Sequence, residues 1–256
     1  NYEIHPKLRK MNLFFILKKI INFISSPKPY VENIVGKYIL YNKESYKKEA
    51  ENFFKKKELL KYFISGNKTE IKPEFLDLKN LYQSIIKRKP KIVLEFGVGF
   101  STIAMLLALH ENSVSGVSGK LYVVDPEKKW IKNTKKKLPS FLKKYVIFNY
   151  SSTRANNLNG QLVSFFDKLP DISPNIILLD GPNPESVIGS VNGLKFSSGR
   201  PIIAADILLY ESSSPTDFLI IVDGRHRNAN FLKKNLKLNY KFSRNVGFKR
   251  FTIEKL

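Results

Sequence analysis

The chain has 256 residues, 43% of them hydrophobic, which is enough apolar material for one large domain or for one domain with a substantial extension. It has no cysteine, which excludes disulfide scaffolds, thiolate zinc sites and cysteine nucleophiles. The net charge of +22 comes mostly from lysine, whereas arginine, which binds phosphates and guanine edges through paired hydrogen bonds, is scarce. The charge therefore favours a compositional bias, or a membrane or glycan surface, over nucleic acid as the partner.

The first ninety residues carry a large share of this charge, with 20 Lys and Arg against 9 Asp and Glu. Residues 8–24 alternate apolar pairs with lysines at helical spacing, and two prolines follow. Such a helix packs its apolar side on its own domain or on a sister subunit, or else lies on an anionic membrane. Residues 43–63 predict a second charged helix. We assign residues 1–70 to a basic helical extension and residues 71–256 to the main domain.

The apolar run at residues 13–17 is too short to span a bilayer, and no cleavage site of a secretory signal accompanies it. We therefore expect a soluble, cytoplasmic protein. Peripheral contact of the first helix with a membrane, and association into homo-oligomers, stay open.

From residue 72 onward, strand patterns alternate with helical ones, which is typical of parallel βαβ units in a sheet covered by helices on both faces. The segment 201–211 could begin a strand, but a proline at its first position and two alanines favour a helix. Residues 240–243 and 248–254 predict an antiparallel pair at the sheet edge. The other strands are expected at residues 92–95, 121–125, 145–149, 176–180 and 217–222, and the helices at residues 73–88, 102–110, 127–138, 201–211 and 228–236.

A short apolar strand, an acid, two glycines and an apolar helix follow one another in residues 91–109. The glycines let the backbone turn tightly and approach a ligand, and the amides that open the helix supply hydrogen-bond donors. A dinucleotide site would need a third glycine where Thr102 stands, and the Glu95 carboxylate would lie beside a pyrophosphate of like charge. The pattern suits a cofactor with an ammonium and a sulfonium, such as S-adenosylmethionine (SAM). The predicted cofactor loop comprises Glu95, Gly97, Val98, Gly99, Ser101 and Thr102, with Ser101 as the helix cap.

Four predicted strands end in acids, and the carboxyl ends of parallel strands meet at one edge of the sheet, where ligands bind. At the second of these ends, Asp125 is predicted to accept hydrogen bonds from ribose hydroxyls, with Pro126 beside it. Capping the next helix is the alternative role for Asp125. Ser151 and Ser152, just past the third strand, are predicted to hold the adenine edge, although serines are also ordinary loop residues.

The reacting end of the cofactor is expected to face Asp180 and Asp223. Asp180 opens an Asp-Gly-Pro-Asn-Pro segment, and its carboxylate could act as a general base, bind a divalent cation or orient the pocket. Arg225 is predicted to anchor an anionic acceptor, and His226 is a candidate general base because its ordinary pKa lies near neutrality. These four residues form the predicted catalytic set, and Asp180 also belongs to the predicted cofactor residues.

These motifs resemble those of class I SAM-dependent methyltransferases, with residues 95–101 as the first motif, Asp125 as the ribose acid and Asp180 as the acid of the fourth strand. The Leu-Asp-Gly-Pro, Ala-Ala-Asp-Ile-Leu and Val-Asp-Gly-Arg segments also resemble an uncharacterised bacterial group linked to surface-glycan modification. The resemblance implies a Rossmann-like α/β fold and SAM as cofactor, with S-adenosylhomocysteine as product. It also implies methylation of a hydroxyl on a small molecule, a glycan or a nucleotide sugar.

Departures from other branches of that family narrow the reaction. Cytosine C5 methylation needs a cysteine, DNA amino methyltransferases carry two prolines and an aromatic residue after the fourth-strand acid, and ribose 2′-O enzymes carry a Lys-Asp-Lys-Glu set; the sequence matches none of these. Catechol-type enzymes bind a divalent metal through paired acids after the fifth strand, but Gly224 interrupts that pair, so no metal site is predicted. RNA methylation, and a non-catalytic binding module at a membrane or partner surface, stay as alternatives.

Overall fold

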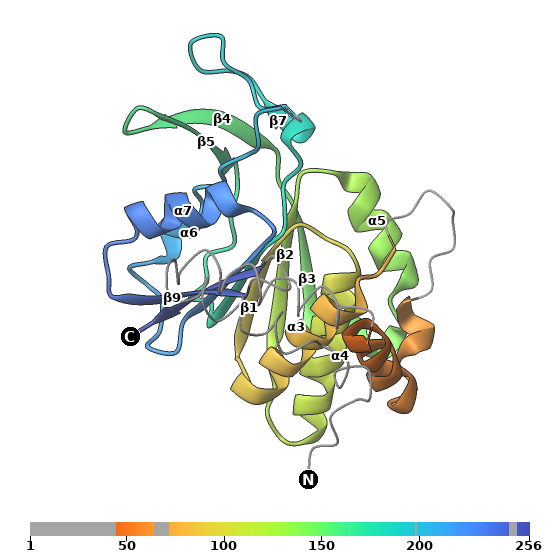
Figure 1. Cartoon of the computed structure of the whole chain (residues 1–256). Helices are drawn as coiled ribbons and strands as arrows, with labels where there is room; N and C mark the ends of the chain where they lie inside the picture. The colour runs from red at the N-terminus through yellow and green to blue at the C-terminus, as the bar shows by residue number, and fades with distance from the viewer. Residues whose placement is uncertain (1–44, 64–71, 198, 246–249) are drawn as a thin grey trace, which may run out of the picture. The chain divides into compact units, whose positions relative to one another are not determined.

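The computed structural model describes residues 45–63, 72–197, 199–245 and 250–256 (Figure 1). The helix predicted at residues 8–24 and the domain boundary predicted at residue 70 lie outside these ranges. The chain divides into two units, residues 1–46 and residues 47–256, and the description below concerns the second. In the described part of the chain, no helix has the length and apolar character needed to cross a membrane.

The main sheet has seven strands in the order β3-β2-β1-β6-β8-β10-β9. The first five in this order are parallel, and β10 pairs antiparallel with both β8 and β9. The chain leaves β1 toward one edge of the sheet and returns to the other side at β6, so the strand order reverses between β1 and β6. In open α/β sheets the ligand binds beside such a reversal. The strands are Ile92–Phe96 (β1), Lys120–Asp125 (β2), Val146–Tyr150 (β3), Ile176–Leu179 (β6), Leu219–Asp223 (β8), Tyr240–Asn245 (β9) and Arg250–Lys255 (β10).

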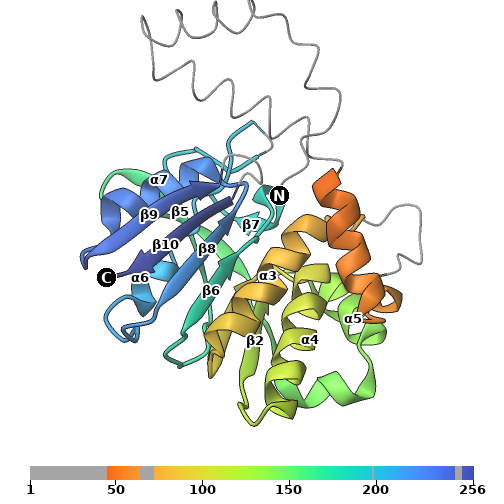
Figure 2. The ribbon, with the colours of Figure 1, turned by 60° about the horizontal axis from the view of Figure 1, so that its bottom comes forward.

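Helices cover both faces of this sheet (Figure 2). The central strands are mostly apolar because alternate side chains point to opposite faces and both faces are buried; the acids Glu95, Asp125 and Asp223 are at or near their carboxyl ends. In β1, Val93 packs with the α3 and α4 side, whereas Leu94 packs with the α6 and α7 side. The helices are Phe75–Arg88 (α3), Phe100–Val114 (α4), Lys128–Lys137 (α5), Ile207–Tyr210 (α6) and His226–Asn235 (α7), with short 3₁₀ turns at Leu60–Phe63 (η2), Ser140–Tyr145 (η3) and Pro184–Ser186 (η4).

A second, three-stranded sheet has the order β5-β4-β7 and was not predicted from the sequence. Figure 1 shows it rising beyond the end at which β3 leaves the main sheet. Its hairpin turns through Asn159 and Gly160, both with positive φ, which is the turn chemistry of two-residue hairpins. The Asn-Gly pair between two alternating segments is the signal that sequence reasoning missed. The strands are Thr153–Leu158 (β4), Gln161–Phe166 (β5) and Val187–Ile188 (β7).

Two predicted helices differ from the structure. The single helix predicted over residues 201–211 is wrong in its first half, where the chain is extended and only Ile207–Tyr210 is helical. The extended part is held because Ser164 of β5 donates its N–H to Ile203 O at 2.8 Å and accepts the N–H of Ala205 at 3.0 Å. In the predicted helix at residues 43–63, the described helix ends at residue 56, and Glu58 adopts a positive φ of 58° before η2 begins.

Candidate functional site

A cavity of about 410 Å³ lies at the carboxyl ends of β1, β2, β6 and β8. Its volume falls in the range of small-molecule sites. Side chains of α3, α5 and β10 complete the walls. The predicted site residues that line it are Gly97, Val98, Gly99, Ser101, Asp125, Pro126, Asp180, Asp223 and Arg225, whereas Glu95, Thr102, Ser151, Ser152 and His226 do not.

The two glycines of the loop after β1 meet different surroundings. Gly97 has a φ of +104°, and a Cβ at this position would lie 3.0 Å from the backbone nitrogen of Gly181. A Cβ on Gly181 would lie 2.7 Å from the Cα of Gly97, so the loops after β1 and β6 touch backbone to backbone. Gly99 has an extended φ of 174°, and nothing lies within 4 Å of its Cβ position. Gly97 is therefore required by the protein itself, whereas Gly99 keeps space open beside the cavity.

Glu95 lies behind this loop and is fully buried. Its carboxylate accepts hydrogen bonds from Ser101 Oγ at 2.5 Å and Thr102 Oγ1 at 2.6 Å, and Thr102 Oγ1 accepts the N–H of Gly99 at 3.1 Å. Burial raises the pKa of Glu95 to about 8 against the opposing effect of the two hydroxyl bonds, and the charges of Asp180 and Asp125 raise it further. Glu95 thus holds the loop in shape from behind, since each of its oxygens already has a protein partner.

Asp125, at the end of β2, is 6% exposed. Its Oδ1 accepts the backbone N–H of Glu127 at 2.7 Å and so closes the turn just before α5. The capping role expected for Asp125 is not present, because the N-cap of α5 is Glu127 and the helix has no side-chain cap. Burial raises the pKa of Asp125 to about 6, opposed by the N–H groups of Glu127 and Val98, while the Glu127 charge adds to the rise. The Glu127 side chain accepts a hydrogen bond from Asn183 Nδ2 at 3.1 Å, which joins the loops after β2 and β6. Sequence reasoning missed Glu127 and Asn183, although both adjoin predicted site segments.

Asp180 faces the cavity where the loop after β6 begins. Arg225 holds that loop: its Nη2 donates to the carbonyl oxygen of Asp180 at 2.6 Å and its Nη1 to that of Pro182 at 3.1 Å. The Asp180 side chain is exposed by area, yet cavity walls surround it. This burial, followed by the charge of Asp223, raises the pKa of Asp180 to about 7, against the opposing charges of Arg225 and Arg250. Solvent that reaches the carboxylate screens these charges. The anion-anchoring role of Arg225 stays a prediction, since both its Nη atoms bind backbone.

Arg250 reaches the same end of the cavity from β10 and is 6% exposed. Its Nη2 lies 3.5 Å from Asp77 Oδ1, and its Nε lies 4.0 Å from Asp223 Oδ1. Arg250 therefore ties α3, β8 and β10 together around the acids. Sequence reasoning missed it because only the folding of the last strand against β8 brings residue 250 to residue 223.

The lining of the cavity is acidic although the protein is strongly basic. Six carboxylates and four cationic side chains line it, in a chain of net charge +22. A negatively charged ligand would therefore meet net repulsion, whereas a neutral or cationic one would not. The acidic side chains are Glu74, Asp77, Asp125, Glu127, Asp180 and Asp223, and the cations are Lys72, Lys137, Arg225 and Arg250.

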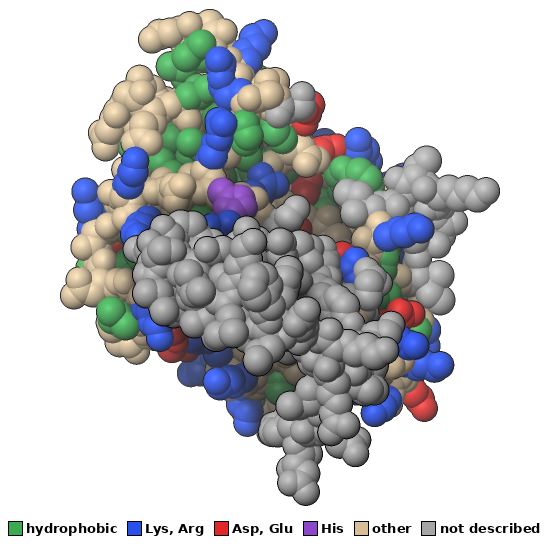
Figure 3. Space-filling model, viewed as in Figure 1, with side chains coloured by type: hydrophobic (Ala, Val, Ile, Leu, Met, Phe, Trp, Pro, Cys, Tyr) green, Lys and Arg blue, Asp and Glu red, His purple; other side chains and the backbone are tan. Residues whose placement is uncertain are grey.

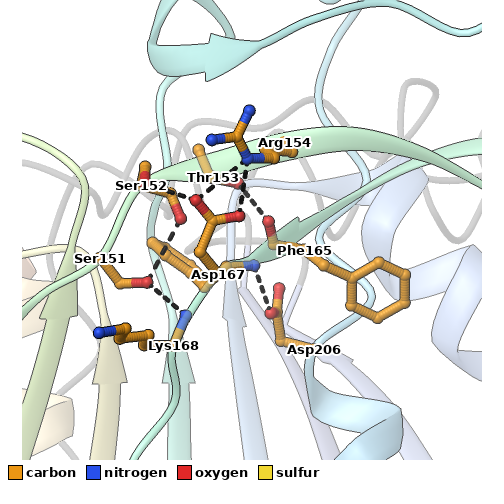
Figure 4. A network of polar contacts seen from close by, with 9 residues as sticks. Ser151, Ser152, Thr153, Arg154, Phe165, Asp167, Lys168 and Asp206 are labelled. Atoms are coloured by element: carbon orange, nitrogen blue, oxygen red, sulfur yellow. Dashed lines mark hydrogen bonds and ion pairs between the residues drawn. The ribbon is translucent and has the colours of Figure 1, made fainter.

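Ser151 and Ser152 instead support the base of the β4–β5 hairpin (Figure 4). Ser151 Oγ accepts the N–H of Lys168 at 2.8 Å, and Ser152 Oγ donates to Asp167 Oδ2 at 2.6 Å. His226 is exposed, and its ring packs edge-on against Phe251 with the ring centroids 4.9 Å apart. Among the described residues, no group of three or more His, Cys, Asp and Glu side chains could hold a metal ion.

The strand order, the reversal beside β1 and the antiparallel pair at the edge confirm the predicted fold, a Rossmann-like, mostly parallel α/β sheet with a C-terminal antiparallel pair. A scan against protein-family models and a search of curated proteins found no match. The chain is similar to an S-adenosylhomocysteine-bound methyltransferase of Podospora anserina, with 12% identity and a TM-score of 0.47 over 90% of this chain and 97% of the other.

Two further solved structures are similar at the same distant level. A methyltransferase of Geobacter sulfurreducens has 15% identity and a TM-score of 0.43, over 81% of this chain and 88% of the other. An O-methyltransferase of Bacillus cereus in complex with S-adenosylhomocysteine has 12% identity and a TM-score of 0.42, over 82% of this chain and 91% of the other.

Proposed function

We propose that this protein is a SAM-dependent methyltransferase that methylates a hydroxyl group of a small molecule or glycan. One observation carries the proposal: a single cavity gathers an open glycine turn, a buried carboxylate at the end of β2, and the acids Asp180 and Asp223. A purely structural sheet has no reason to collect these groups in one space.

The residues of the cavity fit the proposed cofactor. The open space at Gly99 is a cradle that a side chain would fill. Asp125 is the carboxylate that would accept hydrogen bonds from the ribose hydroxyls. The net acidity of the lining suits a ligand that carries an ammonium and a sulfonium. When bound, SAM would supply an electrophilic methyl group on a sulfonium leaving group.

The chain's own contribution to the reaction would be to orient the acceptor and to remove its proton. Asp180 is our candidate for the general base, because a carboxylate with a pKa raised to about 7 is partly ionised at neutral pH and is a stronger base than an ordinary one. Arg225 would keep Asp180 in place through its backbone bonds. The acidic lining favours an acceptor without negative charge near the reacting hydroxyl.

Isothermal titration calorimetry with SAM and S-adenosylhomocysteine tests the cofactor. We expect both to bind the folded protein, and a folded sample that binds neither would remove the methyltransferase proposal. Transfer of radiolabelled methyl to a panel of neutral sugars, acidic sugars, nucleotide sugars and RNA then tests the acceptor. Label in RNA alone would favour the RNA methyltransferase instead, and cofactor binding without transfer to any of these acceptors would favour the non-catalytic module.

A further inference from the structure

Helix α5 has two different sides. Trp130, Asn133, Thr134 and Lys137 line the cavity, and Ile131 faces the core. The opposite side carries Lys128, Lys132, Lys135 and Lys136, which occupy neighbouring positions on one helix stripe and are all exposed. We call these four residues the lysine stripe.

The lysine stripe belongs to a segment of unusual charge. Residues 128–144 contain eight lysines and no acidic residue, and no arginine occurs between Arg88 and Arg154. Lys129 of α5 forms a salt bridge with Glu127. No lysine of the stripe forms a salt bridge with another described residue. Figure 3 shows Lys and Arg side chains distributed widely over the described part of the face drawn there. The stripe is therefore a row of ammonium groups without acidic partners in the part of the chain that the structure describes.

The aromatic residues of the neighbouring edge strand lie under this stripe. Lys128 Nζ lies 4.6 Å from the ring centroid of Tyr150, and Lys135 Nζ lies 5.1 Å from that of Phe148. Tyr150 is 49% exposed at the edge of the sheet. The surface thus combines cations with an amphipathic aromatic side chain, the pairing found where proteins meet the headgroup level of a membrane.

We propose that the lysine stripe docks this protein on an anionic lipid surface, next to the cavity. Lysine is a point charge suited to a diffuse negative surface, whereas recognition of single phosphates or guanine edges uses the paired donors of arginine. The stripe also stands on the convex surface of a helix, which suits a flat partner.

Vesicle co-sedimentation of the full chain tests the docking. Wild type should bind vesicles of phosphatidylcholine mixed with phosphatidylglycerol at physiological ionic strength, and should not bind vesicles of phosphatidylcholine alone. The variant Lys128→Gln/Lys132→Gln/Lys135→Gln/Lys136→Gln should bind the anionic vesicles at least about tenfold more weakly, because each lysine near such a surface contributes about 1 kcal/mol.

A matched control removes the same charge elsewhere. Lys233, Lys234, Lys237 and Lys241 are exposed on α7, the turn after it and β9, and their change to Gln should leave vesicle binding within about twofold of wild type. The basic segment at residues 1–44 is present in both variants, so the comparison isolates the stripe. Circular dichroism would verify that both variants are folded.

Three outcomes would overturn the proposal. The first is an equal loss of vesicle binding in the two variants, and the second is no binding of the wild type to anionic vesicles. The third is tight RNA binding that depends on the lysine stripe, in a protein that does not bind vesicles. Cofactor binding is measured separately by calorimetry, so a failed docking test would not contradict the proposed methyltransferase function.

Discussion

Gly97 and Gly99 stand two residues apart, yet the structure needs them for different reasons. Gly97 is held in a left-handed conformation against the backbone of Gly181, so any side chain there would push two loops apart. Gly99 is extended and borders open space. From the sequence alone, the two glycines look like parts of one turn. Because only Gly99 borders open space, a substitution at Gly99 tests whether the ligand binds there.

The variant Gly99→Ala should fold normally and bind SAM at least about tenfold more weakly, because its methyl group would occupy space intended for the ligand. Calorimetry measures the affinity. Gly199→Ala is the matched control, since Gly199 also lacks a positive φ and its nearest Cβ neighbour, Ser197 Oγ, is 4.0 Å away. Unchanged affinity in Gly99→Ala would place the ligand elsewhere.

We expect Asp125 to act mainly in SAM binding and Asp180 mainly in methyl transfer. Asp125→Ala should weaken SAM binding by roughly 10- to 100-fold, the usual cost of removing a charged hydrogen-bond partner. Asp180→Ala should change SAM affinity much less while reducing methyl transfer. Calorimetry and a transfer assay on both variants check this, and equal losses of affinity would show that the two acids are misassigned.

The protonation of Asp180 should be visible as a pH dependence. Because its pKa is raised to about 7, first by burial and then by Asp223, transfer should increase as pH rises through about 7 and the base loses its proton. Asp223→Asn removes the like charge, so the pKa of Asp180 should fall and the increase should move to lower pH. Carbon-13 NMR titration of the Asp180 carboxyl group measures this directly. An unchanged titration midpoint of Asp180 in Asp223→Asn would contradict the proposed effect of the Asp223 charge on the pKa of Asp180.

At the scale of elements, Asp206 connects α6 to β5. Its Oδ1 accepts the backbone N–H of Phe166 at 2.8 Å, while its Oδ2 is buried and has no hydrogen-bond partner among the described residues. Burial raises the pKa of Asp206 to about 7, and the backbone N–H groups of Phe166 and of Asp206 itself oppose the rise. The folded protein therefore favours the protonated form of the Asp206 carboxyl group at the junction between the hairpin and the main fold.

This raised pKa predicts how stability depends on pH. Between the unfolded pKa of about 3.9 and the folded value the native state binds more protons, so the free energy of unfolding should fall as pH rises through this window. Asp206→Asn removes the titrating group and should reduce that fall by about 1–3 kcal/mol in urea unfolding at several pH values. Asp167→Asn is the control, because the hydroxyl of Ser152 and the charge of Arg154 lower the pKa of Asp167. In this variant the free energy of unfolding should still fall as pH rises toward neutrality. Identical pH profiles for wild type and Asp206→Asn would contradict the prediction.

At the scale of the whole molecule, the cavity joins the two halves of the sheet. Loops from β1 and β2 on one side of the strand-order reversal, and from β6 and β8 on the other, contribute to its walls. The Arg225 bonds, the Glu127–Asn183 bond and the contact of Gly97 with Gly181 cross between these loops. A ligand held there would contact groups that are together only in the folded state.

S-adenosylhomocysteine should therefore raise the Tm of the protein. A ligand that binds only the native state adds about 2.7 kcal/mol at a concentration one hundred times its Kd. Differential scanning fluorimetry with and without the ligand measures the shift, and Asp125→Ala should show little shift at the same concentration. A wild type whose Tm does not respond would argue against a ligand bridging the two halves.

Much of the fold could be predicted because local patterns dictate it. Apolar strands buried on both faces, helices with an apolar side, and acids at strand ends are all readable from neighbouring residues, and Asp125, Asp180 and Asp223 do meet at one cavity. The contacts of Glu95, Ser151 and Ser152 could not be predicted. Ser151 and Ser152 bind Lys168 and Asp167, just after the end of β5, and the two oxygens of Glu95 accept hydrogen bonds from its own loop.

The sequence by itself determined the alternation of strands and helices, the glycine loop and the acids along one sheet edge, since side-chain periodicity and turn chemistry act over a few residues. Only the tertiary structure decided that Gly181 packs on Gly97, that Arg250 of the last strand lines the cavity, and that residues 201–205 extend along β5 instead of forming a helix. These contacts join backbone segments far apart in the chain, and no local pattern records which distant segment will satisfy a given backbone group.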